Sequence, residues 1–74
     1  MWLVTVTCSG DDWKRHGKEF LAIADKYQNT CISSKKMPDG KRFMEYQVED
    51  VGDAEAFQDE SLTLEGFSAS FESL

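Results

Sequence analysis

The residues best suited to chemistry are the single histidine, His16, and the two cysteines, Cys8 and Cys31. A thiolate beside a histidine can act as a nucleophile, and the start of a helix lowers the pKa of a thiol. Cys8 ends a predicted strand and precedes a predicted helix that carries His16. A cysteine in an apolar strand is more often a small buried hydrophobic residue, however. We therefore expect Cys8 to be buried and inert, and we predict no catalytic residue and no enzymatic activity.

Motifs for metals, cofactors and nucleic acids are missing from the sequence. The cysteines form no CxxC or zinc motif, the acids in residues 49–60 lack the spacing and glycine of a calcium loop, and the glycines form no phosphate loop. RNA-recognition domains stack bases on sheet aromatics, but the chain has no RNP sequence, and its net charge of −6 opposes phosphate binding. Basic residues do gather near a predicted hairpin tip: Lys35, Lys36, Lys41 and Arg42. We expect this tip to protect a sheet edge, and we predict no metal, no cofactor and no nucleic-acid partner.

The elements that would position these residues can be read from the spacing of apolar side chains. Trp2 and Val4 share one face of a strand with period two, whereas Phe20 and Ala24 share one face of a helix. Pro and Gly in the segment 37–40 predict a turn that joins two strands into a hairpin. The expected order is strand, helix, strand, strand, helix, strand. The predicted ranges are residues 2–8, 12–28, 30–36, 41–49, 50–60 and 67–73.

This order of elements predicts one α+β domain that spans residues 1–74. We expect a ferredoxin-like βαββαβ sandwich, in which a four-stranded antiparallel sheet of order 4-1-3-2 carries two helices on one face. Trp2 and Trp13 should belong to the core, and Gly17 should mark a close approach of the first helix to the sheet. Val51 and Leu62 should lie on the apolar side of the second helix.

The other face of the predicted sheet has no helix to cover it. Leu3 and Thr5 from the first strand, and Phe43 and Glu45 from the third, should point to this open face. Phe43 is the aromatic residue that we most expect to be exposed, because Met44 and its alternate neighbours take the core face.

The charge of the chain is distributed unevenly. Residues 1–42 contain eight basic and five acidic residues, whereas residues 43–74 contain nine acidic residues and no Lys or Arg. Repulsion within such a stretch opposes compaction, so the acidic half either contacts a basic partner or only keeps the domain in solution. The acids expected to contact a partner are Glu49, Asp50, Asp53, Glu55, Asp59 and Glu60.

We therefore expect a small acidic, non-enzymatic interaction or regulatory protein, of the phage or bacterial regulator type, that binds a protein with a basic surface. The open-sheet residues and the acids are the predicted partner-binding residues. An alternative is a small-molecule-sensing domain that acts as an edge-strand dimer through the smooth strand at residues 67–73, so both a monomer and a homodimer remain open.

The number of cysteines and the N-terminal sequence indicate the cellular compartment. The apolar run at residues 1–6 is too short for a signal peptide or a membrane span, and the chain has only two cysteines. We expect a cytoplasmic protein that does not contact a membrane.

Overall fold

The centre of the molecule is a pair of antiparallel strands, β1 (Trp2–Cys8) and β3 (Arg42–Val48), in a computed structural model that describes all residues from 1 to 74. β2 (Asn29–Lys36) pairs with β3 and β4 (Ser68–Ser73) pairs with β1, so the strand order is β2-β3-β1-β4. All three pairings are antiparallel. The order is the predicted 4-1-3-2 read from the other edge.

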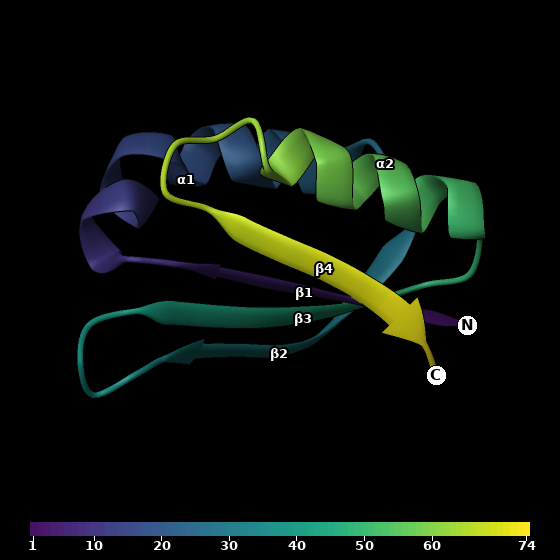
Figure 1. The fold of residues 1–74 in the computed structure, drawn as a ribbon, viewed down its shortest axis with the longest axis horizontal. Coiled ribbons are helices and arrows are strands. Elements are labelled where there is room, and N and C mark those ends of the chain that lie inside the picture. The colour runs from purple at the N-terminus through teal and green to yellow at the C-terminus, as the bar shows by residue number, and fades with distance from the viewer.

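Two helices, α1 (Gly10–Asp25) and α2 (Val51–Ser61), lie side by side on one face of this sheet (Figure 1). In that view α2 and β4 are nearest the viewer, while α1 and β2 lie behind. The opposite face of the sheet carries no element. The predicted ferredoxin-like α+β sandwich is therefore confirmed. Neither helix is both long and apolar enough to cross a bilayer.

Side chains near the helix ends set the helix boundaries. α1 begins at Gly10 because the Oγ of Ser9 accepts a hydrogen bond from the backbone N–H of Asp12 at 3.1 Å. It ends at Asp25, earlier than predicted, and the side-chain amide of Asn29 donates to the carbonyl of Ala24 at 2.8 Å. α2 begins after Asp50, whose carboxylate caps the N–H of Asp53 at 2.9 Å.

The core is a cluster of aromatic and aliphatic side chains between the helices and the sheet. Phe20 of α1 and Phe57 of α2 are fully buried, with ring centroids 5.9 Å apart, and Tyr46 of β3 lies within 5.9 Å of both. Trp2 and Trp13, which were predicted to belong to the core, are only partly buried and pack against this cluster from its edge. Such tilted aromatic contacts add about 0.5–1.5 kcal/mol per pair to the effect of burial, which matters in so small a core.

Three expectations about the helices are wrong. Val51 and Leu62 are 46% and 48% exposed, because the buried positions of α2 are Ala54, Phe57 and Ser61. Ser61 is tolerated there because its hydroxyl donates to the carbonyl of Phe57 at 2.8 Å. Gly17 does not mark an approach to the sheet.

The neighbour that Gly17 accommodates belongs to the same helix. A methyl group at Gly17 would lie 3.2 Å from the indole of Trp13, one helical turn earlier. The absence of a side chain at Gly17 therefore lets the Trp13 indole lie along α1, where the guanidinium of Arg42 stacks on it at 4.5 Å.

Candidate functional site

The ten predicted contact residues fall on two different surfaces. Leu3, Thr5, Phe43 and Glu45 alternate with the core residues of β1 and β3, so they face the open side of the sheet, as predicted. The acids from Glu49 onward lie on α2 and on the connection that leads into it. Because the helices cover the opposite face, one flat partner surface cannot contact both groups.

The open face is less exposed than expected at one position. Leu3 is only 9% exposed, which corrects its assignment as an accessible contact. Its cross-strand neighbours on the same face are Gln47 and Glu72, and these long side chains flank it on both sides. Phe43, Thr5 and Glu45 are partly buried, so part of the Phe43 ring remains accessible on this face.

The acids from Glu49 onward lie on or next to a single element, α2. We call Glu49, Asp50, Asp53, Glu55 and Asp59 the α2 acidic surface. Four of them are exposed and Asp53 is half-buried. None of the five lies within 4 Å of a cationic side chain, because the ion pairs in the structure are His16–Glu19 and Lys26–Glu60. No ion pair within the domain therefore neutralises these five charges, and only the carboxylate of Asp50 has a contact of its own, with the backbone N–H of Asp53.

Glu60, the sixth predicted acid, is already engaged inside the protein. The Nζ of Lys26 donates to its Oε1 at 2.6 Å, and the hydroxyl of Tyr27 donates to its Oε2. The hydrogen bonds from Lys26 and Tyr27 hold the pKa of Glu60 below its ordinary value, and the same contact raises the pKa of Tyr27. Glu60 thus joins α2 to the end of α1, and its assignment as a free partner contact is not supported by its position.

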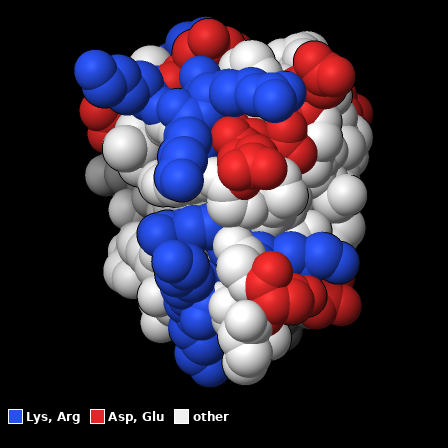
Figure 2. Space-filling model, turned by 90° about the vertical axis from the view of Figure 1, so that its left-hand side faces the viewer, with Lys and Arg blue, Asp and Glu red and all other residues white.

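Folding brings most of the basic side chains together in space. Seven of the eight basic residues lie within residues 14–18 of α1 and 35–42 of the hairpin. These segments meet at one end of the molecule, since a methyl group at Gly10 would lie 2.9 Å from the carbonyl oxygen of Gly40. Figure 2 shows this end, with two groups of basic side chains and acidic side chains among them.

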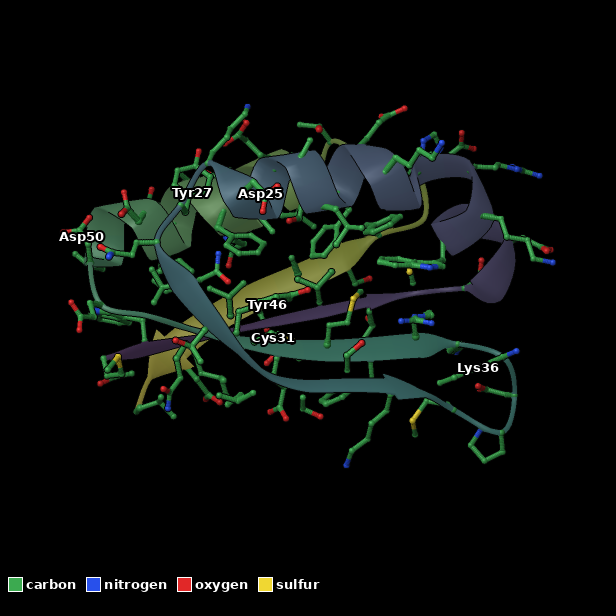
Figure 3. The ribbon with its side chains drawn as sticks, turned by 180° about the vertical axis from the view of Figure 1, so that it is seen from behind. Asp25, Tyr27, Cys31, Lys36, Tyr46 and Asp50 are labelled. Carbon is green, nitrogen blue, oxygen red and sulfur yellow. The ribbon has the colours of Figure 1, made fainter.

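The opposite end of the molecule carries acidic groups. In Figure 3, Asp50 is labelled at one end, Tyr27 and then Asp25 follow toward the middle, and Lys36 is labelled at the other end. The excess of acids in residues 43–74 predicted an acidic surface. The grouping of basic residues at one end could not be predicted in this way, because it depends on a tertiary contact between α1 and the hairpin turn. Most basic residues therefore lie toward one end of the molecule, and acidic residues lie at both ends.

The cysteine and histidine do not form an activated pair. Cys8 is buried, and burial together with the nearby Asp12 carboxylate raises the pKa of its thiol, which is opposite to what a nucleophile needs. The Nδ1 of His16 lies 3.7 Å from a carboxylate oxygen of Glu19 on its own helix. Cys31 is exposed on β2, and β3 separates its strand from that of Cys8. The expectation that Cys8 is a buried hydrophobic residue is confirmed.

The concave features of the surface are small and polar. One hollow of about 170 Å³ is lined by Met1, Gln28, Asn29, Thr30, Gln47 and Glu49. A second, of about 220 Å³, is lined by Thr7, Cys8, Ser9, Asp12, Lys41, Gly66 and Ser68. Both are below the roughly 300–1,000 Å³ of ordinary ligand pockets. No three His, Cys, Asp or Glu side chains gather closely enough to hold a metal ion.

Comparison with known proteins finds no match, since no family model fits the sequence and neither the curated proteins nor the solved structures show significant similarity to it.

Proposed function

We propose that this protein is a non-enzymatic interaction or regulatory module that binds a basic protein surface through the α2 acidic surface. The observation that carries the proposal is the lack of any cation within 4 Å of the five carboxylates, in a domain whose basic residues are concentrated elsewhere. Like charges held close together raise the free energy of the folded state, and a basic partner would relieve this repulsion.

The physical chemistry of such a contact predicts its behaviour. Complementary charge accelerates association and fixes the orientation of the two proteins, and its effect is screened by salt. The acids of α2 are carried on a helix packed against the sheet, so little backbone entropy is lost on binding.

The test is affinity purification from the native host at about 50 mM NaCl, followed by measurement of the dissociation constant with the purified partner. The decisive variant is Glu49→Gln with Asp59→Asn, which removes two exposed charges from the α2 acidic surface. At about 0.5–1 kcal/mol per charge, we expect affinity to fall about 5- to 30-fold, and less at high salt.

The matched control is Glu19→Gln with Glu65→Gln. It makes the same change in net charge at exposed positions outside the α2 acidic surface. The control should change affinity less than about twofold. Equal losses in the two variants would show that only net charge matters, and a partner that is retained equally at all salt concentrations would contradict the proposal.

A further inference from the structure

The two edges of the sheet differ in how well they are protected against pairing. β2 is interrupted by a register shift between Cys31 and Ser33, and it ends in Lys35 and Lys36. Bulges and lysines are the usual devices that prevent edge-to-edge pairing. β4 has neither device, and all six of its residues pair with β1 without a shift. The outer edge of β4 therefore presents a regular row of backbone donors and acceptors.

The flank of α2 beside this edge is partly apolar. Val51, Glu55, Gln58 and Leu62 are spaced four, three and four residues apart, so they follow one line along the helix. The opposite flank faces α1, because it carries Glu60, which is bound by Lys26. α2 packs over β1 and β4, so the line from Val51 to Leu62 lies on the side of the β4 edge (Figure 1). We call these four residues the β4-side stripe.

The β4-side stripe is complementary to itself under a two-fold rotation. Positions 51 and 62 are equally far from the midpoint of the stripe, and so are positions 55 and 58. An antiparallel second helix would therefore place Val51 against Leu62 of the partner subunit, and Glu55 against Gln58 of the partner subunit. Apolar side chains meet apolar ones and each carboxylate meets an amide, which is the requirement for a two-fold interface between identical chains.

We propose that a second copy of this chain binds along β4, to form a two-fold dimer with a continuous eight-stranded antiparallel sheet and the two α2 helices side by side. Paired residues must point to the same face of a sheet, so Ser70 or Phe71 lies on the two-fold axis. Val51 and Leu62, which are 46% and 48% exposed in one chain, become buried between the helices. This proposal goes beyond partner binding and does not depend on it, although the dimer would cover Glu55, one of the five acids of the α2 acidic surface.

The charge of the chain predicts an unusual salt dependence for this dimer. Each copy carries a net charge of −6, so long-range repulsion opposes association when salt is low. Added salt screens this repulsion and leaves the apolar contact and the backbone hydrogen bonds in place. Dimerisation should therefore strengthen with salt, whereas binding of a basic partner should weaken. The opposite salt dependences allow the dimer proposal and the partner-binding proposal to be refuted independently.

The experiment is sedimentation equilibrium of the full chain from about 0.01 to about 1 mM, at about 50 and about 500 mM NaCl. We expect a concentration-dependent species of twice the 8.4 kDa chain mass, with tighter association at high salt. Val51→Lys with Leu62→Lys should weaken association at least about tenfold, although it lowers the net negative charge and so reduces repulsion.

The matched control is Leu21→Lys with Ile32→Lys. These residues are 49% and 48% exposed on α1 and β2, away from the β4 edge, and their replacement changes net charge and exposed apolar area similarly. The control should associate as well as the wild type. A strict monomer at about 1 mM and high salt, or equal losses in both variants, would overturn the proposal.

Amide hydrogen exchange of the unmodified protein gives an independent measurement. Amides within residues 68–73 should become better protected as concentration rises, because the outer edge of β4 gains hydrogen-bond partners. Protection that rises instead within residues 29–36 would place the contact on β2 and would contradict the proposal.

Discussion

Gly66 is a position where one added methyl group should lower the stability of the domain through a defined contact. Its φ is +81°, in the left-handed region, and a methyl group there would overlap the carboxylate of Asp12. If that carboxylate rotates away, it loses the hydrogen bond that it accepts from the hydroxyl of Ser9 at 2.8 Å. Gly66→Ala therefore combines a backbone effect with the loss of a side-chain contact at the start of α1.

The magnitude follows from these two parts. A side chain at positive φ costs about 1–2 kcal/mol, partly offset by the lower entropy that alanine gives to the unfolded chain. Displacing the Asp12 carboxylate removes a charge-assisted hydrogen bond worth about 1.5–3 kcal/mol. We expect Gly66→Ala to lower the free energy of unfolding by about 2–4 kcal/mol in urea titrations followed by tryptophan fluorescence.

Gly40→Ala is the matched control for the backbone part alone. Gly40 has a φ of +90° but has open space where the methyl group would lie, so its replacement should cost only about 1 kcal/mol. In an Asp12→Ala background, Gly66→Ala should also cost only about 1 kcal/mol, since the obstacle is gone. If Gly66→Ala lowers the free energy of unfolding equally in the wild-type and Asp12→Ala proteins, this reasoning is refuted.

Three further predictions concern titration, thiol reactivity and the open face. Glu60→Gln should bring the pKa of Tyr27 down toward 10.0 in an ultraviolet titration, while Tyr46, whose pKa burial raises to about 12, stays unchanged. Because the pKa of Glu60 lies below its ordinary 4.5, its contribution to stability is complete above about pH 4.5 and is lost as pH falls through the lowered value. The Glu60→Gln variant should lack this part of the acid dependence in urea titrations. Native protein should show one thiol that reacts rapidly with a disulfide reagent, which Cys31→Ser removes, since Cys8 is buried; two fast thiols would contradict this. Phe43→Ala should cost less than about 2 kcal/mol in urea, and a loss above about 3 kcal/mol would assign Phe43 to the core.

The order of elements and the strand order could be predicted from local patterns. Period-two alternation in residues 2–8 and the turn residues at 37–40 are properties of short segments, so they need no knowledge of the rest of the chain. The βαββαβ order then leaves few topologies, because crossovers are right-handed. The helix ends were less predictable, since the contact that meets the end of α1 comes from Asn29, beyond the helix.

The candidate sites depended more on three-dimensional contacts. Sequence spacing placed Val51 and Leu62 on the apolar side of α2, but the sheet contacts a narrower strip that includes Ser61. Leu3 was expected to be accessible, and its burial results from neighbours on two other strands. Nothing in the sequence separates Glu60 from the other five acids, because its ion pair with Lys26 is a tertiary contact.

The amino-acid sequence by itself determined the class of fold, the aromatic core and an acidic C-terminal half. Each follows from residue type and local period, which act within one segment. Only the tertiary structure decided that the basic residues meet at one end, that Glu60 is engaged, and that β4 and the β4-side stripe share one side of the molecule. Such facts arise when segments distant in the chain pack together, and no local pattern records which neighbours they will have.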